Sequence, residues 1–340
     1  RLGEVRVNGP FDATKSEGKL NVAVLSLDRR VLNLAGAASG IDFGTTVVNS
    51  TNVIELSKAG AVITAVGQLD AARVAITRQK QTTPTLDFRC DYAVTVDNTG
   101  KSALLQKLNL TGTQNNRPLL QTELTSPMTI SFGGANASAG DAALNIDLSG
   151  LNLADWRAFA ADLAPAGMVN ARIKLLSQAG GKRLQFDLDG GVTGLGAKFG
   201  SNAISQADVK LAARGVGVDL KQFTLEDYRV ELAQGGEPAL TLSGQGTFDS
   251  ATQDADLQLA LRATITRLLT LFPQPDAALT GGSVELTGRV ASKAQNQTVI
   301  GRLALTGLSG KFSNFKFASF GTTADLDLGM KGSQLDIRKA

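Results

Sequence analysis

The sequence has no histidine and a single cysteine, Cys90, and aromatic residues make up only 5% of it. Without histidine there is no imidazole to act as a general base, to complete a Ser-His-Asp triad or to bind a metal ion. One cysteine can form neither a disulfide within the chain nor a cysteine zinc site. Cys90 lies in an alternating, strand-like run, where a small apolar core residue is expected rather than a reactive thiol. These absences exclude the commonest catalytic and metal-binding centres.

Clustered charge and long apolar runs are also missing. The chain has 34 Lys and Arg against 31 Asp and Glu, and its longest basic runs are the pairs Arg29-Arg30 and Lys182-Arg183. Nucleic-acid binding normally needs clustered cations to displace the counterions of phosphate, and aromatic side chains to stack on bases. No stretch approaches the roughly 18 consecutive apolar residues of a membrane-spanning helix. The sequence therefore predicts no nucleic-acid partner and no transmembrane helix within these residues.

Three short motifs resemble functional sites, and each is better explained as ordinary strand or loop. Residues 194–200 nearly match a dinucleotide fingerprint, but the last glycine is one residue late and no helix follows. Asp187 and Asp189 alternate with leucine as on a strand, and the Glu that closes a calcium loop is missing. Ser16 and Lys19 have the spacing of some acyl-enzyme hydrolases without the companion motifs. We therefore expect no catalytic residue, no metal site, no cofactor and no enzymatic activity.

What the sequence does contain is period-2 alternation over almost its whole length. Apolar residues alternate with Asn, Thr, Ser, Arg and Glu, which is typical of a sheet with one dry face and one wet face. Turn signals at 97–100, 114–118, 179–182 and 234–238 separate the runs and indicate consecutive antiparallel hairpins. The predicted fold is mainly β: a long, strongly twisted antiparallel sheet rolled into an open groove, with the apolar side chains on a common concave face.

Helical signals are restricted to two short segments, near 153–163 and 265–272. Each carries an apolar stripe at helical spacing and is followed by a proline. Asn152 can cap the first helix and Thr264 the second. Because neither helix has a Lys or Arg cluster on its polar face, we expect both to cover the sheet rather than to lie on a membrane.

The helix and its flanking strands recur after about 115 residues, which is typical of a repeat architecture. The repeat predicts three parts: a divergent β repeat at 1–84, a β repeat at 85–200 with the first helix, and a β repeat at 201–340 with the second. Both ends of the sequence interrupt the strand pattern, so we expect it to be a fragment of a longer chain. Function is therefore expected on a long surface rather than in an enclosed pocket.

The order of helix, proline, small loop and alternating strand, at 153–175 and again at 265–290, resembles the AsmA-like family of bacterial envelope proteins of the TamB and YhdP type. The resemblance covers about residues 85–340. It implies a periplasmic β-groove with an apolar interior that carries phospholipid acyl chains between the inner and outer membranes. It also implies an inner-membrane anchor elsewhere in the parent chain, outer-membrane or periplasmic protein partners, and no catalytic residues.

The energetics of burial favour the same function. Removing apolar surface from water contributes about 25 cal/mol per Å2, so a sheet with one apolar face is stabilised when protein or ligand covers that face. The side chains expected to line the groove are Leu184, Phe186, Leu188, Val230, Leu232, Leu303 and Leu305. The alternative is a structural or adhesive extracellular β-repeat that only spans distance. Such solenoids generally repeat every ~20 to 30 residues, which is much shorter than the period here. The lipid species, the direction and energy source of transfer, and the oligomeric state are left open by the sequence.

Overall fold

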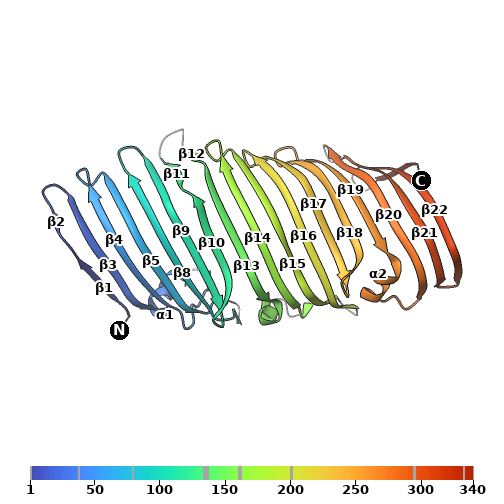
Figure 1. Ribbon diagram of the computed structural model, residues 1–340, viewed down its shortest axis with the longest axis horizontal. Helices are drawn as coiled ribbons and strands as arrows, with labels where there is room; N and C mark the ends of the chain where they lie inside the picture. Colours follow the sequence, from blue (N-terminus) through green and yellow to red (C-terminus); the bar gives the residue numbers. More distant parts are fainter. Residues whose placement is uncertain are drawn as a thin grey trace. The chain divides into compact units, whose positions relative to one another are not determined.

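The computed structural model describes residues 2–36, 39–78, 80–132, 138–159, 163–199, 202–293, 296–331 and 334–339. Most of them lie in a 21-stranded sheet, and a small two-stranded sheet accompanies it (Figure 1). The strand pairs are antiparallel, and the sheet is open. The predicted fold class, a mainly β chain with a twisted open antiparallel sheet, is therefore confirmed.

The chain divides into two compact units. The first unit consists of Arg1–Leu151 and Arg172–Gly181, and the second of Asn152–Ala171 and Lys182–Ala340. Strand β14 (Ala166–Gln178) contributes residues to both units.

In the first unit, successive strands mostly pair with their neighbours in the chain, as hairpins do. The pairing order is β1–β3–β4–β5–β8–β9–β10–β13. The main strands are β1 (Glu4–Asn8), β3 (Glu17–Asp28), β4 (Val47–Ser57), β5 (Val62–Val74), β8 (Leu86–Asp97), β9 (Ser102–Gln114), β10 (Arg117–Ser126) and β13 (Ala142–Asn152). The short strands are β2 (Phe11–Asp12), β6 (Thr77–Arg78), β7 (Gln81–Thr82), β11 (Met128–Ser131) and β12 (Ser138–Ala139).

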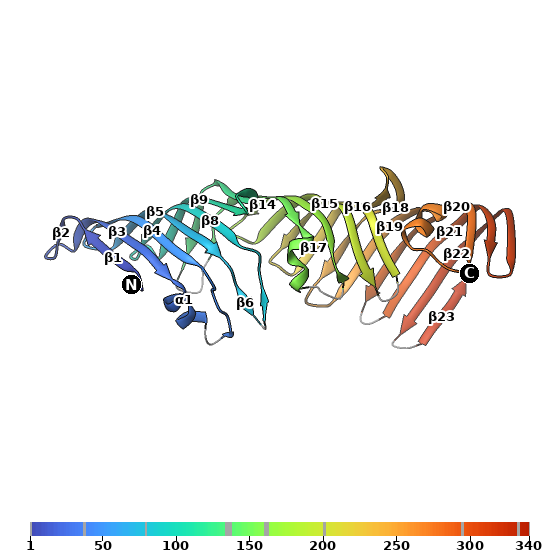
Figure 2. The ribbon, with the colours of Figure 1, turned by 90° about the horizontal axis from the view of Figure 1, so that it is seen from below.

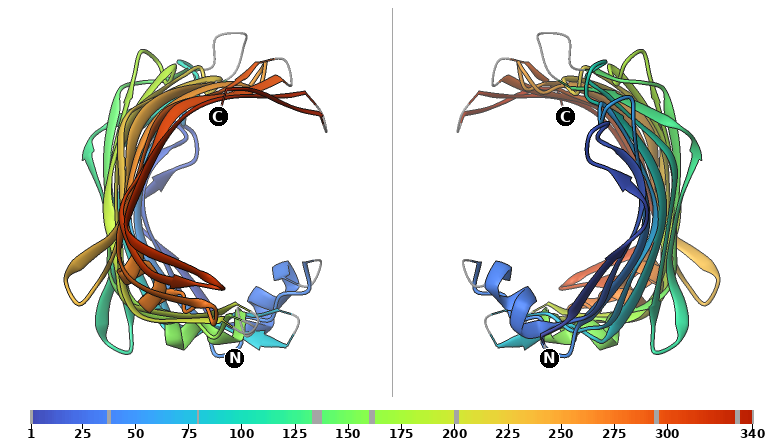
Figure 3. Two further views of the ribbon diagram at one scale, coloured as in Figure 1. Left: turned by 90° about the vertical axis from the view of Figure 1, so that its right-hand side faces the viewer. Right: turned by 90° about the vertical axis from the view of Figure 1, so that its left-hand side faces the viewer.

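The second unit is an uninterrupted meander in which each strand from β15 to β23 pairs with the next. Its strands are β15 (Arg183–Phe199), β16 (Asn202–Val218), β17 (Gln222–Gln234), β18 (Glu237–Asp249), β19 (Asp254–Thr264), β20 (Ala277–Lys293), β21 (Asn296–Phe312), β22 (Phe315–Lys331) and β23 (Gln334–Lys339). The strands of each unit bend along their length into an open arc, seen for the red strands of the second unit and the blue strands of the first (Figure 3).

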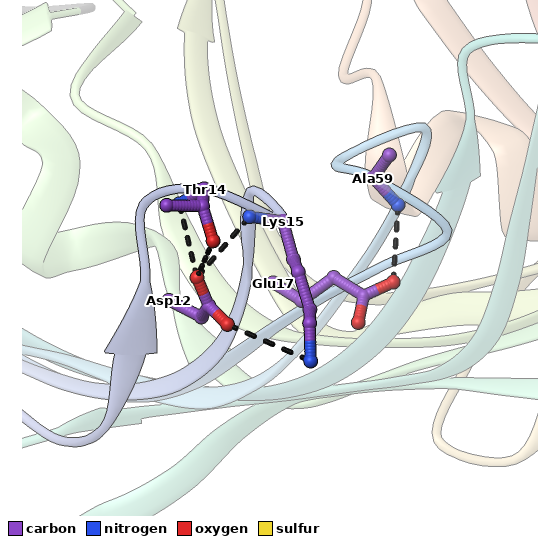
Figure 4. Close-up of polar contacts among 5 residues, drawn as sticks. All are labelled: Asp12, Thr14, Lys15, Glu17 and Ala59. Carbon is purple, nitrogen blue, oxygen red and sulfur yellow. Dashed lines mark hydrogen bonds and ion pairs between the residues drawn. The ribbon is translucent and has the colours of Figure 1, made fainter.

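The hairpins turn where the sequence supplies residues that accept a left-handed backbone. Asn115 and Asn116 both have positive φ, as do Gly235 and Gly236, so both connections are tight two-residue turns that match the twist of the strands. Other turns use an aspartate whose carboxylate accepts backbone hydrogen bonds. Asp12 Oδ1 accepts from the backbone N–H groups of Thr14 and Lys15 at 2.9 and 3.2 Å (Figure 4).

Neighbouring turns are also linked to each other. The carboxylate of Glu17 on β3 accepts a 3.1 Å hydrogen bond from the backbone N–H of Ala59, in the turn between β4 and β5 (Figure 4). Asp97 and Asp249 repeat the carboxylate turn at two later hairpins. These side chains fix the loops that connect the strands and so help to set the strand register.

The two predicted helices are present in modified form. Residues Leu153–Phe159 form a 3-10 helix, η2, and Asn152 Oδ1 caps it by accepting from the Ala154 N–H at 3.1 Å. Residues 160–162 of the predicted segment lie outside the described residues. Helix α2 (Ile265–Leu271) occupies the second predicted segment, but its N-cap Thr264 makes no side-chain capping bond, so the capping role expected for Thr264 is wrong.

One helix was not predicted from the sequence. Helix α1 (Arg29–Gly36) follows β3, and Asp28 Oδ1 caps it through the Arg30 N–H at 2.9 Å. Figure 2 shows α1 and β6 projecting from the same side of the first unit, and the Asp42–Thr77 bridge joins the segment after α1 to β6. In Figure 3 (right) α1 lies at the lower end of the arc of the first unit's strands, beside its open side.

The order strand, short helix, strand therefore occurs three times: β3–α1–β4, β13–η2–β14 and β19–α2–β20. The predicted division into three β repeats stays a prediction. The boundaries expected at 84/85 and 200/201 stay predictions.

Candidate functional site

The strand register determines which side chains share a face, because directly paired residues point to the same side of a sheet. In the second unit two rows of paired apolar residues cross from β16 to β21. The first row is Leu211, Val230, Leu242, Leu261, Leu286 and Leu303, and the second is Val209, Leu232, Leu240, Ala263, Val284 and Leu305. We call the side that carries these rows the apolar face of the second unit.

All seven side chains expected to line a groove lie on this apolar face. Val230 and Leu303 belong to the first row, and Leu232 and Leu305 to the second. The three on β15 join them through β16, where Leu184, Phe186 and Leu188 pair with Gly217, Gly215 and Ala213. The register thus brings the seven together on one side of the sheet. That they line a lipid groove, and that this side is the inner side of the bend, stay predictions.

Helix α2 covers one end of the apolar face. The Leu271 side chain on α2 is buried together with Ala207 and Ala239, and Leu232 packs against this cluster. Leu195, Ile204 and Leu268 also pack against it. Arg267 holds the helix in place, because its guanidinium donates to the Pro238 carbonyl at 3.0 Å and pairs with Glu237 at 3.1 Å. Of the seven predicted side chains, Leu232 therefore packs under the helix.

Most of the apolar face has no second layer of protein packed on it in the described structure. Leu271 is the one large side chain among the described residues with less than 2% exposure. The leucines of the two rows on β17, β18 and β19 are half-buried, and Leu211 and Phe248 on the same face are 38% and 43% exposed. Globular domains normally cover a sheet's apolar side with another layer, so this face is a candidate binding surface.

Glycines occupy many positions between the large side chains of this face, and the neighbouring side chains lie over them. A Cβ on Gly215 would come within 2.8 Å of the Phe186 ring, and one on Gly246 within 2.9 Å of Leu257. Other glycines on this face are Gly190, Gly217, Gly244, Gly288 and Gly301. Side chains converge on the inner side of a bent sheet, and glycine is a common device for such a bend. The glycine positions therefore support the expectation that the apolar face is the inner one.

The opposite face of the second unit carries cross-strand ion pairs. Lys210 pairs with Glu231 at 3.3 Å and Arg262 with Glu285 at 3.5 Å. Asp256 and Arg289 form a bidentate pair, and the hydrogen bond from Arg289 lowers the pKa of Asp256 while raising that of the guanidinium. These exposed pairs favour the observed strand register and make this face hydrophilic. Each pair adds little to the stability of the fold.

A shallow hollow of about 550 Å3 lies on this charged face, between β20 and β21. Its lining residues are Arg289, Ala291, Lys293, Asn296, Thr298 and Ile300. It contains no carboxylate and no nucleophile beside a base, and Arg289 is already paired with Asp256. The hollow therefore offers no arrangement for acid-base or nucleophilic chemistry.

The first unit has an apolar face of the same kind. Paired rows across β3, β4, β5 and β8 contain Leu20, Ile54, Ala65 and Val94 on one side. Cys90 lies on that side too, paired with Leu69, and it is partly buried. Burial, and then the nearby Asp91 carboxylate, raise the pKa of its thiol, which disfavours the reactive thiolate. Cys90 therefore behaves as the apolar residue that the sequence indicates.

Both tyrosines lie on these apolar faces, and each hydroxyl reaches a polar group on another strand. On the first unit's face, Asn52 Oδ1 accepts a hydrogen bond from the Tyr92 hydroxyl. On the second unit's face, the Tyr228 hydroxyl lies 3.5 Å from the Gln258 carbonyl, and burial raises its pKa. Sequence reasoning did not single out these residues, although the chain has only two tyrosines and both fall on alternating apolar positions.

The described residues contain no group of three or more Cys, Asp or Glu side chains arranged to hold a metal ion. No described helix is long and apolar enough to cross a membrane. Comparison of the chain with protein-family models, with curated proteins and with solved structures finds no match.

Proposed function

We propose that this protein is a non-enzymatic conduit that binds the acyl chains of phospholipids along its apolar sheet faces and carries them between the inner and outer membranes of a bacterial envelope. The observation that supports it is the two-faced sheet of the second unit, with rows of Leu and Val on one side and cross-strand ion pairs on the other, together with the similar apolar face of the first unit. In this proposal the chain acts in the periplasm, belongs to the AsmA-like family, and is held at the inner membrane by a segment outside these residues.

An acyl chain suits such a face because it needs contact area rather than a specific polar partner. Each 100 Å2 of apolar surface removed from water contributes about 2.5 kcal/mol. The half-buried rows offer this area over many strands, so a chain can shift along the face without losing a unique contact. The absence of a metal cluster among the described residues is compatible with this function and also with the alternative.

The alternative function is a structural or adhesive spacer whose long sheet only spans distance. The exposed ion pairs of the opposite face suit that role as well as they suit a conduit. The exposed apolar face distinguishes a conduit from a spacer. Leu211 and Phe248 are each more than a third exposed, and a spacer has no use for exposed apolar side chains. We therefore prefer the conduit.

A transfer assay tests the proposal. Donor vesicles with a fluorescent phospholipid, unlabelled acceptor vesicles and the purified chain are mixed, and the rate of dye arrival in the acceptors is measured. We expect transfer by the wild-type chain and strong slowing by Phe186→Asp and Leu305→Asp. A carboxylate on an apolar path costs a few kcal/mol to desolvate, which corresponds to roughly a hundredfold in rate.

Matched controls lie next to each of these positions. Gln185 and Thr306 are exposed and point to the opposite side from their neighbours, so Gln185→Asp and Thr306→Asp should leave the rate unchanged. Thermal melting of all four variants separates a blocked path from a lost fold. Equal transfer by all four variants, or none by the wild type, would favour the spacer.

A further inference from the structure

The apolar face of the first unit contains a polar cluster in the middle of its strands. The cluster consists of Ser50 and Asn52 on β4 and Tyr92 on β8, and we call it the polar station. Asn52 Nδ2 donates to Ser50 Oγ at 2.9 Å, and Ser50 Oγ in turn donates to the Gln68 carbonyl at 3.1 Å. The Tyr92 hydroxyl donates to Asn52 Oδ1. Three strands therefore contribute to one hydrogen-bonded group.

The glycine between these side chains makes the arrangement possible. Gly67 on β5 pairs directly with Asn52 on one side and with Tyr92 on the other, so the Asn52–Tyr92 bond passes over it. A Cβ on Gly67 would overlap Asn52 Oδ1. Only glycine at this position lets the two side chains meet across the intervening strand.

Apolar side chains surround the polar station on its own face. The paired row on one side contains Leu20, Ile54, Ala65 and Val94. The row on the other side contains Leu69, Cys90 and Leu110. The three polar side chains are only half-buried, so a molecule lying on the face would touch them.

The hydrogen-bonding capacity of the station is not used up within the described part of the chain. Asn52 has two amide hydrogens, and its Nδ2 donates to Ser50 alone. A hydrocarbon lying over the station would leave the second hydrogen without an acceptor, which is unfavourable away from water. A ligand with a carbonyl oxygen at that point along its chain would accept it instead.

We propose that the polar station binds the ester carbonyl of an acyl lipid through Asn52 Nδ2, so that the first unit selects ester-linked acyl chains over plain hydrocarbon chains. This inference rests on the proposed function. A site built to hydrogen-bond its ligand discriminates against the analogue that lacks the group, because its own polar atoms are then left unpaired. The station would thus act as a specificity-determining site on a face that otherwise recognises only apolar area.

Binding of methyl palmitate and of an alkane of the same chain length, both delivered from cyclodextrin, tests the inference. Displacement of a bound fluorescent alkyl probe gives the two affinities for the full chain. We expect the wild type to prefer the ester, and Asn52→Leu to reduce that preference about 3- to 10-fold, the range for one neutral hydrogen bond. The infrared stretch of a 13C-labelled ester carbonyl should move to lower wavenumber on the wild type and lose that component in the variant.

A second variant and a control keep the result interpretable. Gly67→Ala keeps every polar group and displaces the Asn52 amide, so it should reduce the preference as Asn52→Leu does. Thr64→Val is the control, because Thr64 makes a comparable 3.2 Å cross-strand bond to Thr95 on the opposite face. It should leave the preference and the carbonyl band unchanged.

The outcomes separate this inference from the proposed function. Equal affinity of the wild type for ester and alkane, or an ester preference that survives both Asn52→Leu and Gly67→Ala, would overturn the polar station while leaving an acyl-binding face. No binding of either ligand by the wild type would overturn both.

Discussion

At the residue scale, the pairing of a large side chain with a glycine on the next strand is the most consistent feature of the apolar face. Phe186 lies over Gly215, Phe223 over Gly217 and Leu257 over Gly246. The glycine leaves room for the neighbouring side chain to lie flat on the sheet, and the large residue shields backbone that glycine would expose. Side chains on this face are therefore packed within one layer.

Gly215→Ala should destabilise the second unit. Its Cβ would lie 2.5 Å from the Thr224 carbonyl oxygen and 2.8 Å from the Phe186 ring, so a backbone or a ring has to move. We expect a loss of about 1–3 kcal/mol, typical of overpacking. Thermal melting followed by circular dichroism measures it.

Gly196→Ala on β15 is the matched control. Its Cβ would meet nothing closer than 3.5 Å, so the substitution should be neutral or slightly stabilising. If the two variants melt at the same temperature, the packing of Phe186 over Gly215 does not require glycine at position 215.

The Asp256–Arg289 pair makes a prediction about pH. The Arg289 hydrogen bond lowers the pKa of Asp256 in the folded chain, so the pair stabilises the fold above the carboxyl's unfolded pKa of about 3.9. That contribution is lost as the pH falls through the lower, folded pKa. Carboxyl NMR titration should show the Asp256 pKa rising towards the ordinary value in Arg289→Gln. An unchanged titration would mean that the pair does not persist in solution.

At the element scale, helix α2 acts as a cover for one end of the apolar face rather than as an independent unit. Leu271 on α2 supplies the buried side chain, and Arg267 binds the first two residues of β18. An isolated helix of seven residues is unstable in water, so α2 depends on this packing. Strand β19 ends at Thr264, where α2 begins. Leu271 of the helix then packs against two small residues of the sheet, Ala207 and Ala239.

Leu271→Ala should release α2 from the sheet. Truncating a fully buried leucine costs about 2–4 kcal/mol, and here the loss falls on one element. Amide hydrogen exchange should therefore accelerate at Phe272, whose N–H donates to the Leu268 carbonyl at 2.7 Å, while β18 and β19 change little. Thr270→Ala on the exposed side of α2 is the control and should leave exchange nearly unchanged. Equal acceleration in both variants would contradict the role of Leu271.

Sequence reasoning predicted elements whose signal is local. Alternation located the strands, and the Asn115-Asn116 and Gly235-Gly236 turns followed from backbone preferences. Helix α1 was missed because its eight residues make only about two turns and directly continue an alternating strand, although Asp28 precedes it as a capping residue. A capping signal without a long apolar stripe is weak evidence for a helix.

Features that depend on register could not be predicted from one sequence. Glycine carries no apolar side chain, so alternation alone does not show that Gly215 pairs with Phe186 or Gly244 with Tyr228. The Asn52–Tyr92 bond joins residues 40 positions apart across an intervening strand. Bulges such as the one between Leu225 and Tyr228 also change which residues align. All of these features depend on which strands pair and in which register.

At the scale of the whole molecule, both units share a sheet layer with an apolar face and a short helix beside the strands, and the second unit also has a charged opposite face. A stable sheet normally buries its apolar side under a second layer. Here that side is half-open in the described structure, so the protein should bind apolar molecules in its native state.

Native-state binding of a hydrophobic dye should therefore be saturable and should be displaced by acyl chains. Leu211 and Leu69, each 38% exposed, lie on the apolar faces of the second and first unit. Dye fluorescence should be high before thermal melting begins and should fall when a long-chain fatty acid is added. Dye that binds only as the chain unfolds would show that the apolar faces are closed in solution.

Site-specific photo-crosslinking in cells tests the central claim most directly. A benzophenone amino acid replaces Phe186 or Leu305 on the apolar face, and Gln185 or Thr306 on the opposite side. The conduit predicts phospholipid adducts, seen by mass spectrometry after irradiation, at Phe186 and Leu305 and none at Gln185 and Thr306. Adducts of equal yield at all four positions, or no lipid adduct at Phe186 and Leu305 in a folded, expressed protein, would contradict it.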